Sequence, residues 1–326
     1  MRNLELMRPQ VSVVIPAFNV ERYLGAALDS ALGQTVEDVE VVVVDDGSTD
    51  GTVAVARGYG DARVRVFENE RNQGPAWSRN AAIAQARGEW IAVLDSDDWW
   101  RAERLERLLA LAEERRADIV CDDLLLVPEG AHEPRSTLFT VHAGRLGRID
   151  GPFEVSALKM VVDDYGILKP LFRREFLIAN GIRYNPAFRA GEDFEMLLRC
   201  LLASGRMVVS HEALYFYRAR SDSLVASPVS CLSRILEMTD ALIRDVDAKT
   251  HGEIVTALEG YRRRKWDELG DASFREPLHA GRWGECLSLA VKNPAMLLRY
   301  AAVLGERFLP VGLVLAMPEW GMGAWR

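Results

Sequence analysis

The sequence predicts an α/β protein in which a mostly parallel sheet is flanked by helices and followed by a helical C-terminal extension. Over the first 120 residues, short β-branched apolar runs alternate with amphipathic helical patterns. Strands joined by helices imply right-handed crossovers and a parallel sheet covered on both faces. Beyond residue 230 the pattern becomes helical throughout, with no internal repeat.

Each element has a local signal. Strands are expected where β-branched apolar runs occur, and helices where apolar residues recur every three or four positions. Asn19 is expected to cap the first helix and Gly33 to end it, while Pro75 opens a later helix that Gly88 stops. In chain order the N-terminal pattern gives strands at 11–15, 39–44, 63–67, 90–94 and 118–127, and helices at 19–33, from 52, at 75–87 and at 105–112.

The rest of the chain is less regular. Residues 128–150 are rich in Gly, Pro and polar residues and are expected to form a mobile loop. Mixed elements follow to about residue 220. Helices are then expected near 230–246, 252–270, 281–291 and 295–308. These changes in pattern predict a catalytic domain over residues 1–225 and a helical region over 226–326.

Composition excludes several classes of protein. Lys and Arg number 40 against 48 Asp and Glu, so the net charge of −8 argues against nucleic-acid binding. The four cysteines form no CxxC pair, which indicates reduced core thiols of a cytosolic protein. The N-terminus has no apolar core of a secretory signal, and no run is long enough to span a membrane. We therefore expect a cytoplasmic protein that is soluble or lies on a membrane surface.

Acidic residues gather where the predicted strands end. Asp45 and Asp46 follow the second strand, and Asp95, Asp97 and Asp98 follow the fourth. Ligands of open parallel sheets bind beyond the carboxyl ends of the strands, so these five acids are expected at the functional edge.

The run 95–98 (DSDD) is typical of a divalent-metal site. In an extended segment residues i and i+2 share a face, so Asp95 and Asp97 would point the same way. Carboxylate oxygens are the ligands that Mg²⁺ and Mn²⁺ prefer, with substrate phosphates in the remaining positions. The alternative is that these acids are solvated and cap the next helix.

The run 45–50 (DDGSTD) suits a nucleotide. A carboxylate at this edge can accept a hydrogen bond from a base or a ribose, and Gly47 permits a sharp turn. An ordinary Asp-Gly turn is the alternative. No GxGxxG follows the first strand and no Walker A loop is present, so neither a dinucleotide-binding Rossmann domain nor a P-loop is expected.

Taken together, these motifs strongly resemble the family 2 inverting glycosyltransferases of the GT-A (Rossmann-like) fold, and in particular bacterial enzymes that build exopolysaccharide or surface glycans. The resemblance covers roughly residues 10–225. It is carried by residues 13–19 (VVIPAFN), 42–48 (VVVDDGS), 72–75 (NQGP), 78–80 (SRN), 94–98 (LDSDD), 191–194 (GEDF) and 217–218 (YR).

The resemblance implies roles at matching positions. Backbone at Pro16 and Ala17 and the side chain of Asp46 would hold the nucleotide base, with a UDP-sugar as the expected donor. Asp95 would lie near the ribose. Asp97 would ligate a Mn²⁺ or Mg²⁺ ion that bridges the diphosphate, with Asp98 as the competing ligand. The remaining donor-site residues would be Asn19, Glu21, Arg79 and Ser96.

An acidic pair, Glu192 and Asp193, opens a later predicted helix. Acids at a helix N-terminus are stabilised by about 0.3–1 kcal/mol, so capping alone would explain them. The resemblance implies that the pair supplies the general base, with Asp193 preferred and Glu192 in acceptor binding. Many relatives carry a histidine near position 220, where this chain has Arg220, which suggests a guanidinium contact with the diphosphate. His211 is expected to be structural.

The C-terminal region has two features of open meaning. The basic run 261–266 (YRRRKW) is either a solvated helix face or a contact with anionic lipid. Residues 294–326 mix apolar, basic and aromatic side chains, which fits an interfacial helix, packing onto the catalytic domain, or a homodimer interface.

The sequence therefore predicts a metal-dependent inverting glycosyltransferase that transfers a sugar from a nucleotide-sugar to a glycan acceptor, here expected to be lipid-linked, at the inner face of the cytoplasmic membrane. A nucleotidyltransferase would need a glycine-rich basic loop after the first strand, which is absent. The alternative is a non-catalytic, nucleotide-sugar-binding scaffold of a glycan assembly complex.

Overall fold

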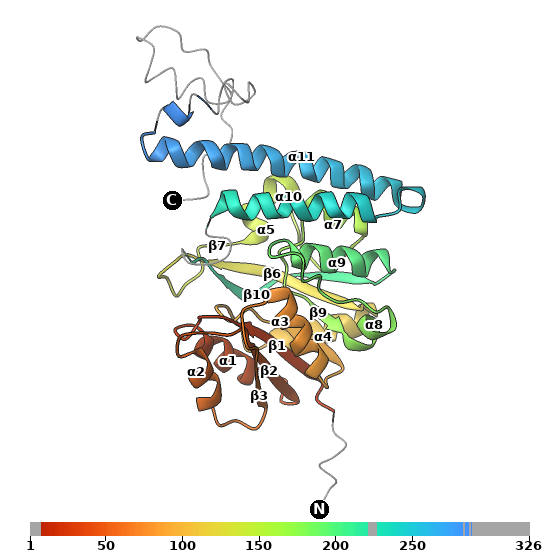
Figure 1. The fold of residues 1–326 in the computed structure, drawn as a ribbon. Helices are drawn as coiled ribbons and strands as arrows, with labels where there is room; N and C mark the ends of the chain where they lie inside the picture. The colour runs from red at the N-terminus through yellow and green to blue at the C-terminus, as the bar shows by residue number, and fades with distance from the viewer. Residues whose placement is uncertain (1–7, 221–226, 283, 287, 289–326) are drawn as a thin grey trace, which may run out of the picture.

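The computed structural model describes residues 8–220, 227–282, 284–286 and 288, and all statements below concern these residues. Its centre is a ten-stranded sheet (Figure 1). The strands are β1 (Val11–Ala17), β2 (Val39–Asp45), β3 (Val64–Glu68), β4 (Trp90–Val93), β5 (Trp99–Trp100), β6 (Ile119–Val127), β7 (Ser136–Thr137), β8 (Phe153–Val155), β9 (Leu171–Arg173) and β10 (Met207–Arg218).

The main path of the sheet runs in the order β3-β2-β1-β4-β9-β6-β10-β5, with β7 beside β6 and β8 beside β10. Every strand of four residues or more pairs in parallel with another such strand: β3, β2, β1 and β4 form one parallel block, and β6 and β10 another. Antiparallel pairings all involve the short strands β5, β7, β8 and β9. The expectation of a mostly parallel α/β sheet is confirmed.

Helices flank this sheet. They are α1 (Leu24–Leu32), α2 (Thr52–Gly58), α3 (Pro75–Gln85), α4 (Arg104–Arg115), α5 (Leu138–Val141), α6 (Ala143–Leu146), α7 (Ala157–Asp163), α8 (Arg174–Ala179), α9 (Glu192–Leu202), α10 (Pro228–Asp245) and α11 (Ala248–His279). Helices α10 and α11 lie side by side in a layer beyond α9, where α11 also contacts α7 (Figure 1). The helical extension thus packs on α9 and α7, two of the helices that flank the sheet.

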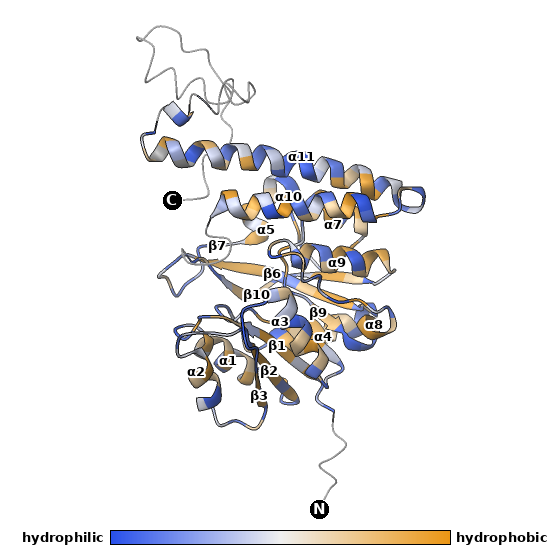
Figure 2. Cartoon of the chain, viewed as in Figure 1, coloured by the Kyte–Doolittle hydropathy of each residue, from blue (hydrophilic) through white to orange (hydrophobic). Residues whose placement is uncertain are grey.

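The core follows from the apolar runs. All seven residues of β2 (VEVVVVD) are buried, as are β4 and six of the seven residues of β1. Figure 2 shows these strands as the most hydrophobic part of the fold and α11 as a mixture of polar and apolar positions. Helix α4 buries Leu105, Leu108 and Ala112, the periodic residues that predicted it. Burial of such β-branched and aliphatic surface supplies the main driving force of folding.

Three expectations need correction. Asn19 does not cap α1, because the helix begins at Leu24 with Tyr23 at its N-cap. Residues 128–150 are not one irregular loop: they contain β7, α5 and α6, and Leu138 and Phe139 anchor the segment in the core. The helix expected at 252–270 is longer, since α11 runs from Ala248 to His279 with a non-helical residue at His251.

The helix at 230–246 is confirmed as α10. Of the helix expected at 281–291, residues 283, 287 and 289–291 lie outside the described part of the chain. The helix expected at 295–308 and the segment 294–326 lie wholly outside it.

Candidate active site

The strand order brings the predicted acids to one edge. Strand β1 pairs with β2 on one side and β4 on the other, so the loops that follow these three strands are neighbours. The backbone N–H of Asp46 donates to the carbonyl of Ala17 at 2.7 Å, which joins the end of β1 to the start of the next loop. Pro16 and Ala17 are in register with Val44 and Asp45. The candidate base-binding segments therefore lie side by side.

Asp45 stabilises the loop that follows β2. One Asp45 oxygen accepts hydrogen bonds from the backbone of Gly47 and Ser48, closing a tight turn. Gly47 has φ +76°, and a Cβ there would lie 2.9 Å from Arg71 Cα, so both conformation and space require glycine.

The Asp46 carboxylate holds a second loop. It accepts hydrogen bonds from Asn69 Nδ2 at 2.7 Å and from the backbone N–H groups of Gln73 and Gly74, the latter at 2.7 Å. These three donors occupy most of the roughly four lone-pair positions of a carboxylate. Asp46 thus fixes the approach to α3 at the same edge where a nucleotide base is expected.

Asn19 and Glu21 join the loop after β1 to the loop after β2. Asn19 adopts a left-handed conformation with φ 50°, and its Oδ1 accepts from the Thr49 backbone at 2.9 Å. Glu21 Oε2 accepts from the Gly51 backbone at 2.7 Å. Both predicted donor-site residues therefore lie at this edge and brace it.

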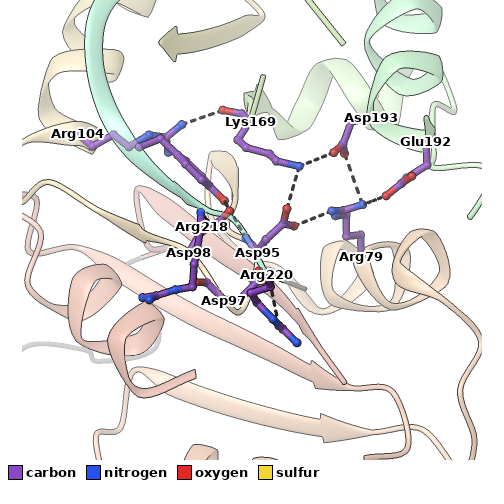
Figure 3. A network of polar contacts seen from close by, with 11 residues as sticks. Arg79, Asp95, Asp97, Asp98, Arg104, Lys169, Glu192, Asp193, Arg218 and Arg220 are labelled. Atoms are coloured by element: carbon purple, nitrogen blue, oxygen red, sulfur yellow. Dashed lines mark hydrogen bonds and ion pairs between the residues drawn. The ribbon is translucent and has the colours of Figure 1, made fainter. Parts of the chain in front are cut away.

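The DSDD segment does not have the extended geometry expected of it. Residues Ser96 and Asp97 form a turn, which the backbone N–H of Asp98 closes by donating to the carbonyl of Asp95 at 3.1 Å. The three carboxylates consequently have different partners (Figure 3). Asp95 contacts Arg79 and Lys169, whereas Asp97 lies 3.0 Å from Arg220.

Asp98 is the most enclosed of the three acids. One oxygen accepts from the Tyr215 hydroxyl at 2.8 Å and the other from the Arg218 backbone at 2.8 Å. Burial, together with the charges of Asp97 and Asp95, raises its pKa well above the usual value. With both oxygens engaged, Asp98 ties the turn to β10.

Asp97 is better placed to bind a metal. Its side chain is 22 % exposed, and its contacts with Arg220 and with its own backbone leave lone pairs available. Burial and the Asp95 charge raise its pKa, and Arg220 partly offsets that effect. In the described part of the chain no group of three or more His, Cys, Asp or Glu side chains is arranged around a metal position. The residues fit an ion held by one carboxylate and substrate phosphates, a common arrangement for Mg²⁺.

Arg220 stands against Asp97 and over an aromatic ring. Its guanidinium lies 4.5 Å from the centre of the Tyr23 ring, and its side chain is 8 % exposed. Arg218, two residues earlier on β10, lies over the Trp99 ring at 4.4 Å and donates to the Asp97 carbonyl at 2.9 Å. The end of β10 and the residues just after it therefore place positive charge beside Asp97, the candidate metal ligand.

The acidic pair at the start of α9 lies next to the same edge. Gly191, with φ +79°, forms the N-cap, and a Cβ there would lie 2.7 Å from Met238. Glu192 and Asp193 are each 8 % exposed. Glu192 Oε1 lies 2.7 Å from Arg79 Nη1, and burial raises the pKa of Glu192 although the Arg79 charge partly offsets this.

Two buried cations connect the acid pair with the DSDD segment (Figure 3). Arg79 contacts Asp95 at 2.6 Å and Glu192 at 2.7 Å, and lies 3.5 Å from Asp193. Lys169 contacts Asp95 at 2.8 Å and Asp193 at 2.7 Å. Burial raises the pKa of Asp95, but Lys169 and Arg79 outweigh it and lower the pKa below the usual range. We call these five residues the Arg79–Lys169 cluster: Arg79, Asp95, Lys169, Glu192 and Asp193.

Lys169 was missed by the sequence prediction. It stands alone in the apolar run 165–172 (YGILKPLF), and a lone charge in such a run signals a buried ion with a partner. A second missed feature is the fully buried pair of Arg104 and Asp122, 2.7 Å apart, whose arginine donates to the Lys169 carbonyl at 2.8 Å.

Two other sequence features lie outside this site. His211 is exposed on β10. The run 261–266 is not a single solvated face, because Tyr261 is buried and Lys265 lies 3.0 Å from Asp164. Arg262 pairs with Asp240, and Trp266 is 62 % exposed. Within the described residues, none of the helices combines the length and apolarity needed to cross a bilayer.

The sheet order and the helices that flank it are those of the GT-A glycosyltransferase fold. Residues 12–168 match the model of Glycosyl transferase family 2. The chain is 31 % identical over 322 residues to the succinoglycan biosynthesis protein ExoU of Rhizobium meliloti (strain 1021), covering 93 % of this chain and 90 % of that protein. The chain belongs to glycosyl transferase family 2.

The chain is also similar to another succinoglycan biosynthesis protein and to solved glycosyltransferase structures. The succinoglycan biosynthesis protein ExoO of the same organism is 38 % identical over 240 residues, or 72 % of this chain and 66 % of that protein. The fold is similar to S. aureus TarS 1-349 in complex with UDP-GlcNAc, with a TM-score of 0.63, 23 % identity and coverage of 82 % and 80 %. It is also similar to the mannosyltransferase PcManGT from Pyrobaculum calidifontis in complex with GDP-Man and Mn²⁺, with a TM-score of 0.62, 20 % identity and coverage of 92 % and 81 %.

Proposed function

We propose that this family 2 glycosyltransferase is a metal-dependent inverting hexosyltransferase that uses a UDP-sugar and a glycan acceptor. The observation that carries the proposal is the Arg79–Lys169 cluster. In it Asp95, which follows β4, and Asp193, in α9, both pair with the two cations Arg79 and Lys169. A donor-side acid and a candidate base are thereby held within one buried network. An inverting transfer needs this proximity of a proton acceptor and an activated sugar.

On the donor side, Pro16, Ala17 and Asp46 hold the base. Three donors already use the Asp46 carboxylate, which leaves about one lone-pair position for an N–H of the base. Asp95 and Ser96 would lie near the ribose, and Arg220 would contact the diphosphate. The donor pocket is completed by Asn19, Glu21 and Arg79.

Asp97 would hold Mn²⁺ or Mg²⁺, with Asp98 as the less accessible alternative. The ion, when bound, neutralises charge on the diphosphate leaving group. On the acceptor side, Asp193 is the general base and Glu192 helps to bind the acceptor. The acceptor oxygen attacks the anomeric carbon opposite the diphosphate, so no covalent enzyme intermediate is needed.

The biological setting is part of the proposal. The names of the two succinoglycan relatives support a role in exopolysaccharide or surface-glycan biosynthesis. Residues 1–225 would form the donor-binding and catalytic domain. Residues 226–326 would contact the acceptor, anionic lipid or a second copy of the chain. A lipid-linked acceptor would place the protein at the inner face of the cytoplasmic membrane.

The decisive experiment is a thermal-shift panel of UDP-, GDP- and dTDP-sugars with and without Mn²⁺, followed by an assay of nucleotide release. A ligand that binds the native state raises the unfolding temperature by mass action. We expect the largest shift with a UDP-sugar plus Mn²⁺, and slow Mn²⁺-dependent release of UDP with water as acceptor. Binding without any release would favour the non-catalytic scaffold, and full activity in excess EDTA would exclude metal dependence.

A further inference from the structure

Lys169 is a buried charge whose two partners are both functional candidates. Its side chain is 6 % exposed and follows Leu168, and Leu171 comes two positions later; both leucines are fully buried. Its Nζ lies 2.7 Å from Asp193 Oδ2 and 2.8 Å from Asp95 Oδ2. Well-packed apolar side chains often replace buried ion pairs without loss of stability. Stability alone therefore does not account for a lysine at this position.

The main chain at Lys169 is fixed independently of its ammonium group. The carbonyl of Lys169 accepts a hydrogen bond from Arg104, which is itself fully buried and paired with Asp122. The next carbonyl, that of Pro170, accepts from the Val93 backbone at 3.1 Å. Figure 3 shows the Lys169 side chain extending from this anchored point toward Asp95 and Asp193. The ammonium group thus extends from a segment of backbone that other residues hold in place by hydrogen bonds.

The two oxygens of Asp193 differ in their surroundings. Oδ2 accepts from Lys169, whereas Oδ1 is buried and accepts no hydrogen bond from any described residue. The nearest cation to Oδ1 is Arg79 at 3.5 Å, and Arg79 has shorter contacts with Asp95 and Glu192. A buried carboxylate oxygen without a donor is unusual, and an acceptor hydroxyl would satisfy it.

We infer that Lys169 is a positioning residue for the transfer reaction: it holds Asp193 by Oδ2 and presents Oδ1 to the acceptor hydroxyl. This role rests on the proposed function, in which Asp193 is the base. The acceptor proton passes to Oδ1, and the acceptor oxygen forms a bond to the anomeric carbon. The bond from that carbon to the diphosphate oxygen breaks, and the nucleoside diphosphate leaves with the electron pair.

The charges around Asp193 indicate what the loss of Lys169 would change. Asp193 faces Lys169, Arg79 from α3, its neighbour Glu192, and Tyr184. Without Lys169, one cation rather than two would stabilise its anionic form, and Arg79 is shared among three carboxylates. The orientation of the Asp193 carboxylate would then be less constrained.

The test is a comparison of Lys169→Met and Lys169→Arg with wild type. The donor is the sugar nucleotide that gives the largest shift in the thermal panel, and water is the acceptor. For Lys169→Met we expect kcat to fall by ~10-fold to ~10²-fold, up to the loss expected on removing the base itself. The donor KM should stay near that of wild type, and Lys169→Arg should restore part of the lost kcat. If Lys169→Met does not fold, Lys169→Gln, which keeps an uncharged donor, is used instead.

Lys265→Met is a control outside the Arg79–Lys169 cluster, because Lys265 is a partly buried lysine, 12 % exposed, that also pairs with two acids, Asp164 and Glu268. Its kcat and donor KM should equal those of wild type. A wild-type kcat in Lys169→Met would overturn the inference. A loss of donor affinity with an unchanged kcat would overturn it too, because Lys169 would then act through Asp95. By contrast, a normal kcat in Asp193→Asn would disprove the assigned base itself.

Discussion

The guanidinium of Arg79 lies 2.6 Å from the carboxylate of Asp95, although one residue belongs to α3 and the other to the loop after β4. The same side chain reaches Glu192 at 2.7 Å. Acids on the donor side and on α9 therefore depend on one cation, whose side chain is 4 % exposed. These contacts within the protein hold both sets of acids in place, and such preorganisation is the condition for effective electrostatic catalysis.

Arg79→Met should destabilise the protein strongly. The substitution leaves Asp95 and Glu192 buried with fewer partners, and breaking a buried pair costs about 3–5 kcal/mol. Urea unfolding at pH 7 would measure the loss. Arg57→Met is the control, because its pair with Glu68 is 66 % and 40 % exposed and should be worth less than about 1 kcal/mol. Equal losses in the two variants would show that the cluster is not a buried network.

The parts of this site that follow from local pattern could be predicted from sequence. Acids after buried parallel strands must meet at one edge, and Asp46 and Asp95 do lie at the same edge of the sheet, after the two strands that flank β1. Lys169 could not be placed in this way, because its contact with Asp95 spans 74 positions, the difference between 169 and 95, and depends on the antiparallel insertion of β9 between β4 and β6. Contacts between residues so far apart in the chain leave little trace in the periodicity of the sequence.

The local backbone geometry of the site was also not predictable from the sequence. The expectation that Asp95 and Asp97 share a face assumed an extended segment, but the Asp98-to-Asp95 hydrogen bond closes a turn there. The expectation that Asn19 caps α1 was reasonable from residue type, yet its side chain accepts from Thr49 on the neighbouring loop. In both cases a tertiary or turn contact outweighed a preference of the local sequence.

Asp97→Asn should remove the gain in UDP affinity that Mn²⁺ produces. The neutral amide is a poor ligand for a hard cation, whereas the metal-free affinity depends on other residues. Calorimetric titration of UDP with and without Mn²⁺ would measure both quantities. Asp98→Asn tests the competing ligand and should retain most of the Mn²⁺ effect, because Tyr215 and Arg218 already occupy that carboxylate. The opposite ranking would assign the metal to Asp98.

Asp123→Asn should stabilise the protein near neutral pH. Burial raises the pKa of Asp123 from 3.8 to about 6, against hydrogen bonds from Thr137, Phe139 and Leu124 that lower it. The native carboxyl therefore binds its proton more tightly than the unfolded chain does, so its contribution to stability falls as pH rises from about 4 to about 6. Asparagine keeps an acceptor oxygen for the Leu124 and Phe139 backbone and has no charge to bury.

The expected gain for Asp123→Asn at pH 7 is on the order of 3 kcal/mol, since the pKa rises from 3.8 to about 6 and each pKa unit corresponds to about 1.4 kcal/mol. Free energies of unfolding measured from pH 4 to pH 8 would show the two proteins diverging across that window. A constant difference at every pH would mean that Asp123 titrates alike in the native and unfolded states.

The last prediction decides between Glu192 and Asp193. Attack by a hydroxyl at neutral pH needs a positioned proton acceptor, which contributes ~10²–10⁴-fold to the rate. Asp193 has a buried oxygen without a hydrogen-bond donor among the described residues, whereas Glu192 Oε1 is paired with Arg79 and burial raises the pKa of Glu192. Asp193→Asn should therefore lower kcat by at least ~10²-fold with donor affinity nearly unchanged. Glu192→Gln should raise the acceptor KM more than the donor KM.

Single-turnover rates and donor titrations on the same preparations separate the two roles, because a base acts on the chemical step and a binding residue acts on KM. A near-normal kcat in Asp193→Asn would transfer the role of base to Glu192, whose raised pKa would then mark it as the group poised to exchange a proton. A loss of donor binding instead would place Asp193 in the nucleotide site, linked to Asp95 through Lys169. The base would then have to be sought elsewhere.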